Sequence, residues 1–81
     1  MMNVKEAVVV RFQELMKSKR IKTNELANIS GVTPSSVYSM LDPRRKEVSV
    51  NLVKKLCDGL DITLGEFFSA PVFDELNQEI Q

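Results

Sequence analysis

The chain has 81 residues, of which 43% are hydrophobic, with three glycines and three prolines. This composition indicates one compact domain and counts against a disordered chain or a turn-rich β fold. With no histidine and one cysteine, an internal disulfide, a zinc site of the usual nitrogen and sulfur ligands, and histidine-dependent catalysis are excluded. Eleven basic and eleven acidic side chains cancel to a net charge of zero, which by itself counts against a nucleic-acid binder.

The first predicted helix covers residues 4–19. Apolar side chains recur there at intervals of three and four residues, and this period outweighs the local strand preference of the valines at residues 8–10. Asn3 is placed to cap the helix, and Lys19 and Arg20 suit the negative end of its dipole. The apolar runs of the chain are too short for a membrane span or a signal peptide, so we expect a cytoplasmic protein without a membrane partner.

Two short helices are predicted next, separated by a turn. The first, over residues 23–30, begins in a polar segment able to cap it. It ends at Gly31, because glycine accepts the positive φ of a helix C-cap. Thr33 followed by Pro34 is a strong helix-start signal, so the second of these helices is predicted over residues 34–41.

Two further helices are predicted after a basic loop. Ser49 caps the fourth helix, whose apolar stripe includes Cys57 as a buried structural thiol and which ends near Gly59. A capping box at residues 63–66 opens a fifth helix that runs to Phe68. The expected fold class is therefore all-α, with five helices.

The C-terminal tail has one apolar face. Its spacing favours a short sixth helix over residues 71–80. We divide the chain into a helix-turn-helix unit at residues 1–68 and a tail at residues 69–81. The tail and the end of the fifth helix are the candidate homodimer interface, with Phe68, Val72, Phe73, Leu76 and Ile80. The alternative is that the tail packs on its own domain.

Residues 22–41 have the layout of a helix-turn-helix, in which two short helices are joined by about three residues that include a glycine. Ala27 is small enough to let the second helix cross the first closely. The second helix of such a unit enters the DNA major groove. The apolar positions expected to lock the two helices together are Leu26, Ile29, Val32, Val37 and one of Met40 and Leu41.

The residue pattern itself resembles a known family. The chain is similar to the Cro and phage-repressor type helix-turn-helix family, often called XRE, in the segments Glu25-Leu26-Ala27, Ser30-Gly31-Val32-Thr33 and Ser36-Val37-Tyr38-Ser39-Met40. The similarity continues through residues 52–60 and 62–68 and covers roughly residues 6–68. It implies a five-helix, lambda-repressor-like domain that binds double-stranded operator DNA, usually as a homodimer, in the bacterial or phage nucleoid.

The resemblance also implies roles for individual side chains. The start of the second helix of the unit would face the DNA bases, through Pro34, Ser35, Tyr38 and Ser39. Phosphate contacts would come from short hydroxyls and from the basic loop, that is from Thr23, Thr33, Ser36, Arg44, Arg45 and Lys46. Such residues can donate to phosphate oxygens and supply the salt-sensitive part of binding.

The sequence departs from the family at two places. There is no Arg, Asn or Gln between Thr33 and Leu41, so the bidentate pairings to guanine or adenine are absent. Specificity would then come from Tyr38, from apolar contact with thymine methyls, from water or from DNA shape. Asp42-Pro43 stands where many members carry Asn-Gly, and this affects the path of the basic loop.

Two functions are weighed for this chain. The first is a sequence-specific transcriptional regulator, acting as a repressor, without enzymatic activity, cofactor, metal or small-molecule ligand. The alternative is a protein–protein interaction module of the same fold, such as an antitoxin or adaptor, which the missing base-reading amides favour and the basic loop opposes.

The net charge of zero conceals a division along the chain. Residues 1–55 carry all eleven basic side chains and five acidic ones, a net charge of +6, whereas residues 56–81 carry six acids and no base, a net charge of −6. If the acidic third lies away from the helix-turn-helix, screening over about 8 Å hides it from DNA. The sequence therefore predicts a basic face and an opposite acidic face.

Overall fold

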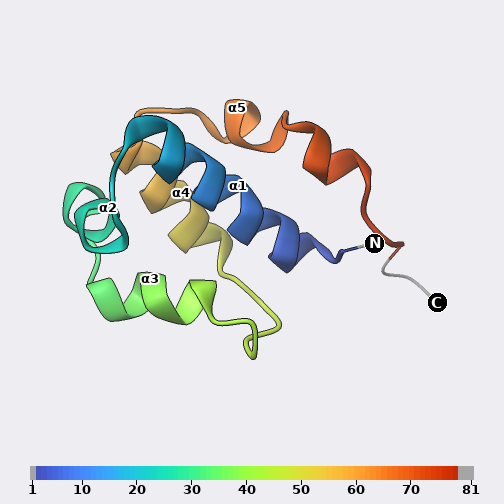
Figure 1. Ribbon diagram of the computed structural model, residues 1–81, viewed down its shortest axis with the longest axis horizontal. Coiled ribbons are helices and arrows are strands. Elements are labelled where there is room, and N and C mark those ends of the chain that lie inside the picture. The colour runs from blue at the N-terminus through green and yellow to red at the C-terminus, as the bar shows by residue number, and fades with distance from the viewer. Residues whose placement is uncertain (1, 79–81) are drawn as a thin grey trace.

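The computed structural model describes residues 2–78, which form five α-helices and a 3₁₀ helix, with no strand in that range (Figure 1). The principal extents of the molecule are 38 × 25 × 20 Å. The predicted all-α, five-helix architecture is confirmed. The elements are α1 (Val4–Lys19), α2 (Thr23–Ser30), α3 (Pro34–Leu41), α4 (Val50–Gly59), α5 (Leu64–Phe68) and the 3₁₀ helix η1 (Pro71–Asp74).

The helix starts follow from local hydrogen bonding. At the start of α1, Asn3 Oδ1 accepts from the Glu6 N–H at 2.9 Å while Glu6 Oε1 accepts from the Asn3 N–H at 3.0 Å. The same reciprocal box joins Thr63 and Glu66 at the start of α5, and these bonds lower the pKa of Glu66. The polar segment before α2 behaves differently, because Lys22 is the N-cap and makes no side-chain capping bond.

One hydrophobic core joins the helices. Leu26 and Ala27 on α2 are fully buried, and α2 packs against both α3 and α4. Phe12 of α1 meets Phe67 of α5 with ring centroids 4.5 Å apart. Cys57 is buried as predicted, and burial raises the pKa of its thiol to about 11. The other core side chains are Ala7, Val8, Met16, Val37, Met40, Val53, Leu56 and Leu60.

The helices α2 and α4 approach each other closely where Ser30 meets Gly59. A Cβ atom placed on Gly59 would lie 2.1 Å from Ser30 Oγ and 2.9 Å from Ser30 Cα. Gly59 therefore does more than end α4, since only a glycine lets the two helices approach this closely. The Ser30 hydroxyl is buried there and has no hydrogen-bond partner within the described part of the chain.

Ile29 does not help to lock α2 onto α3, contrary to the expectation from the sequence. Its side chain is 50% exposed. The buried face of α2 is centred on Leu26, Ala27 and Ser30, and at about 100° per residue Ile29 lies roughly a third of a turn away from that centre.

The tail forms a shorter element than the helix expected over residues 71–80. Only Pro71–Asp74 is helical, as η1, and residues 75–78 are irregular; Ile80 lies outside the described residues. Phe73 packs on Phe67 and Phe68, with centroids 5.7 and 4.9 Å apart, and η1 lies against α1. A ten-residue helix is marginal in isolation, so tertiary packing of the aromatic side chain determines the path of the backbone.

Candidate nucleic-acid interface

The α2–α3 corner is built by two local signals. Gly31 ends α2 at φ +69°, and the Val32 N–H then donates to the Ala27 carbonyl at 3.1 Å. Thr33 starts α3 by accepting from the Ser36 N–H through its hydroxyl at 3.3 Å. Figure 1 shows α2 and α3 as two short helices joined by this turn, with α3 along the lower edge of the molecule.

The outward face of α3 is polar. Val37 and Met40 point into the core, and the four residues predicted to face bases, Pro34, Ser35, Tyr38 and Ser39, are all exposed. Tyr38 is 55% exposed, so its ring does not fold back onto the core.

Hydroxyl groups form a small cluster at the start of α3. Thr33 Oγ1 lies 3.2 Å from Ser35 Oγ and 3.0 Å from Ser36 Oγ. These contacts hold the three hydroxyls close to the N-terminal end of α3, where free backbone N–H groups attract anions.

A groove runs beside Tyr38, between α3, the second half of α1 and the start of α2. Thr23, which the sequence predicts to contact phosphate, lines this groove together with polar residues that the sequence analysis did not predict as phosphate contacts. The lining residues are Gln13, Met16, Lys17, Ile21, Lys22, Thr23, Asn24 and Tyr38. The basic run at the end of α1 is the signal that could have indicated Lys17 and Lys22.

The loop after α3 is closed by a turn at Asp42-Pro43. The Arg45 N–H donates to the Asp42 carbonyl at 3.0 Å, and the Arg44 N–H donates to Asp42 Oδ1 at 2.9 Å. Asp at the first and Pro at the second position are the residues that such a turn favours. The departure from Asn-Gly therefore gives this loop a defined start.

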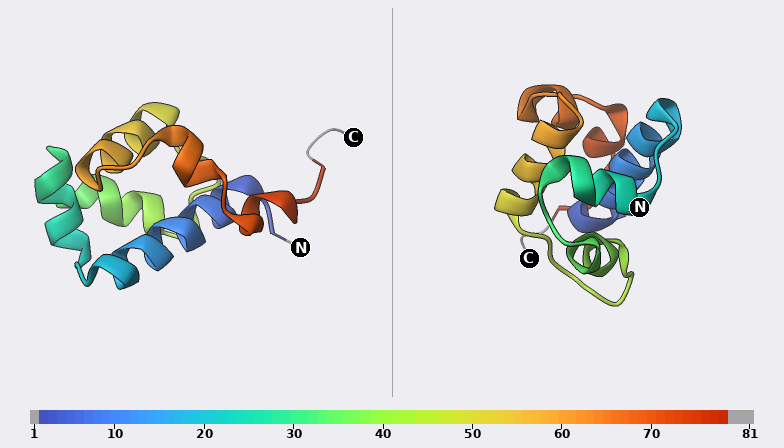
Figure 2. Two further views of the ribbon diagram at one scale, coloured as in Figure 1. Left: turned by 90° about the horizontal axis from the view of Figure 1, so that it is seen from above. Right: turned by 90° about the vertical axis from the view of Figure 1, so that its left-hand side faces the viewer.

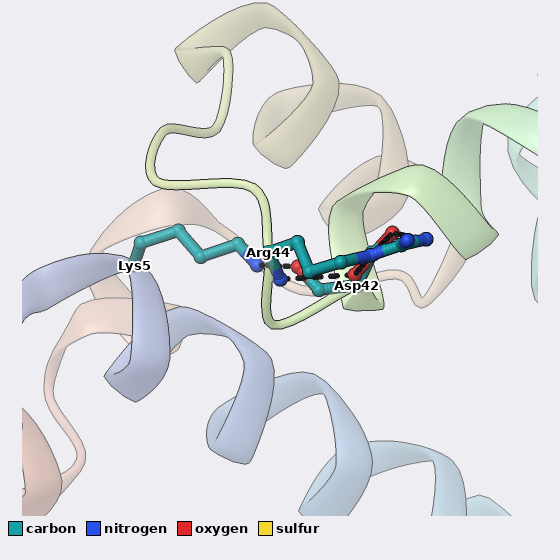
Figure 3. A network of polar contacts seen from close by, with 3 residues as sticks. All are labelled: Lys5, Asp42 and Arg44. Atoms are coloured by element: carbon teal, nitrogen blue, oxygen red, sulfur yellow. Dashed lines mark hydrogen bonds and ion pairs between the residues drawn. The ribbon is translucent and has the colours of Figure 1, made fainter.

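A buried lysine anchors this turn to α1. Lys5 is only 4% exposed, and its Nζ donates to the Asp42 carbonyl at 2.7 Å (Figure 3). Its cation also lies at the C-terminal end of α3, where the helix dipole favours positive charge. Sequence reasoning missed Lys5, although its spacing to Val8 and Phe12 places it on the buried face of α1.

The side chain of Arg44 is held by Asp42. Arg44 Nη2 lies 2.9 Å from Asp42 Oδ2, and Arg44 Nε lies 3.1 Å from Asp42 Oδ1 (Figure 3). This hydrogen bonding lowers the pKa of Asp42 to about 2. The predicted phosphate-binding residues Arg45 and Lys46 are exposed on the same loop.

Comparison with known proteins identifies the family that has this arrangement of helices. A family model described as the Cro/C1-type HTH DNA-binding domain matches residues 11–72, well over half of the chain. The chain belongs to the Cro/C1-type helix-turn-helix family. The resemblance found in the sequence is thereby confirmed.

A solved structure supports the same assignment for this Cro/C1-type domain. The crystal structure of the prophage Lp1 protein 11 is similar to it with a TM-score of 0.81 and 28% sequence identity, over 94% of this chain and 100% of that one. A comparison with curated protein sequences finds no match. No helix of residues 2–78 has both the length and the apolar character needed to cross a membrane.

The charge division of this Cro/C1-type domain is only partly a division in space. Figure 1 shows α3 and the basic loop along the lower edge and α5 along the upper edge, and the end-on view in Figure 2 agrees. α5, which belongs to the part of the sequence that carries no base, therefore lies on the side away from α3. Basic side chains also reach the acid-rich part of the chain, since Arg11 donates to two carbonyls at the end of α5 and Lys54 pairs with Asp58.

Proposed function

We propose that this Cro/C1-type domain is a sequence-specific transcriptional regulator that acts as a repressor by placing α3 in the major groove of double-stranded DNA. The observation that carries the proposal is the composition of one face. An exposed polar helix lies between a groove that contains two lysines and a loop that contains three cations. α5, in the acid-rich last third of the sequence, lies on the other side of the domain.

The proposal assigns two sets of residues. Those that face the bases are Pro34, Ser35, Tyr38 and Ser39. Those that contact phosphate are Thr23, Thr33, Ser36, Arg44, Arg45 and Lys46. The groove beside Tyr38 suggests that Lys17 and Lys22 extend the phosphate contacts toward α1. Because α3 carries only short hydroxyls and one aromatic ring, DNA shape and phosphate position contribute much of the specificity.

The experiment is a binding titration combined with selection of bound duplexes from a random DNA pool. We expect measurable binding at about 50 mM salt, and a log–log salt slope near −0.9 for each phosphate contacted. Replacing Arg44, Arg45 and Lys46 together by alanine flattens the slope, whereas Lys55→Ala on α4 leaves it unchanged. The proposal fails if the wild-type protein shows no binding to any duplex at that salt concentration.

A second candidate function is a protein–protein module such as an antitoxin or adaptor. The absence of Arg, Asn and Gln between Thr33 and Leu41 favours it, and so does the exposed apolar side chain of Ile29 beside the corner. The same random-pool selection separates the two functions. A module that no longer reads DNA enriches no sequence, whereas a repressor enriches one motif.

We further propose that the DNA-binding form is a homodimer joined through α5 and the tail. Phe68 is 42% exposed and lies against Phe73. Val72 and Leu76 are only half-buried. A single short helix reads few base pairs, and two half-sites about one helical turn apart supply the rest. The tail packs on its own domain through Phe73, so the proposed interface consists of the side chains that remain partly exposed.

A further inference from the structure

The three cations of the loop after α3 are not equivalent. Arg44 has an 88% exposed side chain, yet both Nε and Nη2 are hydrogen bonded to the Asp42 carboxylate. Within the described residues, the side-chain ion pairs are Arg44 with Asp42 and Lys54 with Asp58. The exposed side chains of Arg45 and Lys46 belong to neither ion pair, whereas the guanidinium of Arg44 is already paired with the carboxylate of Asp42.

Asp42 is the fixed member of its pair. Its carbonyl accepts from the buried Lys5 ammonium at 2.7 Å and from the Arg45 N–H at 3.0 Å. Its carboxylate also accepts from the Arg44 N–H at 2.9 Å, and its side chain is only 22% exposed. Figure 3 shows Asp42 held between Lys5 and Arg44. The guanidinium is therefore the part that moves when the pair opens.

The geometry of this pair is the geometry in which arginine binds phosphate. A guanidinium presents parallel N–H donors that fit a carboxylate and a phosphate equally well. A DNA phosphate that uses the same edge of Arg44 must displace the carboxylate of Asp42. The pKa of Asp42, about 2, keeps that carboxylate charged at any pH at which DNA is bound. The competition is therefore constant and does not depend on pH.

We propose that Asp42 is an intramolecular competitor at the DNA-binding face, because its carboxylate occupies the edge of Arg44 that a DNA phosphate would use. A duplex that engages this edge must first open the pair with Asp42. Asp42 therefore weakens binding most for the duplex that places a phosphate best for bidentate pairing with Arg44. This inference rests on the proposed function.

The test compares Asp42→Asn with Glu47→Gln. Asparagine keeps an oxygen for the Arg44 N–H and the backbone carbonyl for Lys5, so the turn is preserved while the charge is lost. Glu47 is exposed on the same loop and is not bonded to Arg44, so its variant is the matched control for net charge. Each protein is titrated by fluorescence anisotropy with a duplex selected from the random pool and with its scrambled version, between 50 and about 300 mM salt.

The proposal predicts the larger effect for the selected duplex. Asp42→Asn tightens binding to the selected duplex about two- to fivefold, the range for an exposed ion pair, because displacement of the carboxylate no longer costs free energy. Binding to the scrambled duplex tightens by the same factor or less. Glu47→Gln shifts both duplexes equally. In an Arg44→Gln background, Asp42→Asn has only the effect of Glu47→Gln, because the side chain it would release is absent.

Two results overturn the inference while leaving the proposed function standing. If Asp42→Asn and Glu47→Gln have the same effect on both duplexes, Asp42 contributes only its net charge. If Asp42→Asn weakens binding to both duplexes, its role is to position the loop, and the Arg44→Gln variant checks this without disturbing the turn. Absence of binding by the wild-type protein and by every variant at 50 mM salt is a different result, which rejects the proposed function itself.

Discussion

The contact between α2 and α4 determines how firmly the helix-turn-helix is held on the domain, and Gly59→Ala tests it. The added Cβ would lie 2.1 Å from Ser30 Oγ and 2.9 Å from Ser30 Cα. Rotation of the hydroxyl relieves the first contact but not the second, so the helices must separate. Overpacking of this kind costs about 1–3 kcal/mol. Alanine recovers up to about 1 kcal/mol of helix propensity, so we expect a net loss of about 1–2 kcal/mol.

Two companion variants make the reasoning specific. Ser30→Ala removes a buried hydroxyl that has no partner in the described structure, so it should be neutral or stabilising by up to about 1 kcal/mol. In the double variant it should recover part of the Gly59→Ala loss, because the contact with Oγ disappears while the contact with Cα remains. Gly65→Ala is the matched control, since its added Cβ meets only Thr63 Oγ1 at 3.8 Å.

Urea and thermal unfolding followed by circular dichroism measure these changes. For a domain of this size each kcal/mol shifts Tm by roughly 4–8 °C, and the total unfolding free energy is about 4–12 kcal/mol. A Gly59→Ala protein as stable as wild type would refute the close-contact argument. So would a double variant whose free energy is the sum of the two single changes, since residues in contact do not behave additively.

Three further outcomes follow from the described contacts. Arg11 donates from Nε and Nη2 to two carbonyls at the end of α5, at 2.9 Å each. In urea unfolding, Arg11→Ala should therefore lower the unfolding free energy by about 1–3 kcal/mol, and Arg11→Lys should recover only part of that loss, because one ammonium cannot reproduce both donors of the guanidinium. Equal stability of Arg11→Ala and wild type would contradict this. Burial raises the pKa of the Cys57 thiol from 9.0 to about 11, so between these two pH values the unfolded chain loses the thiol proton while the folded chain keeps it. The unfolding free energy of the wild type should therefore fall relative to that of Cys57→Ala between pH 9 and 11. Parallel pH profiles of the two proteins would refute this. In sedimentation, Phe68→Ser should lower the average mass of the protein toward that of the monomer, whereas Ile29→Ser, at a similarly exposed apolar site, should leave it unchanged. Equal masses for the two variants would show that the interface does not include Phe68.

Much of the fold could be predicted because its signals are local. Asn3, Thr33, Ser49 and Thr63 each cap the helix that follows. Gly31 adopts the left-handed conformation for which glycine is suited. A capping bond involves residues two or three positions apart, so the sequence alone contains both partners. The tail lacks such a signal, and its apolar spacing was a poor guide because packing on α1 determined the backbone path.

The candidate site divides in the same way. The exposed face of α3 and the basic loop could be identified from residue type, whereas the outward direction of the Tyr38 side chain was established only by the structure. The pairing of Arg44 with Asp42 was not predicted, although the two residues are close in sequence. It depends on the turn that Pro43 makes and on Lys5, which approaches from a helix far earlier in the chain.

By itself the sequence determined the five helices, their caps and the polar character of α3, because these depend on side chains a few residues apart. Tertiary structure alone decided which cations are available and how the charges are distributed. Lys5 became an anchor and Arg44 became paired because distant segments meet at Asp42. The loop after α3 lies on a different side of the molecule from α5 (Figure 1) because α3 and α5 pack on different sides of one core, whereas the first and last described segments of the chain meet where the Asn77 N–H donates to the Met2 carbonyl.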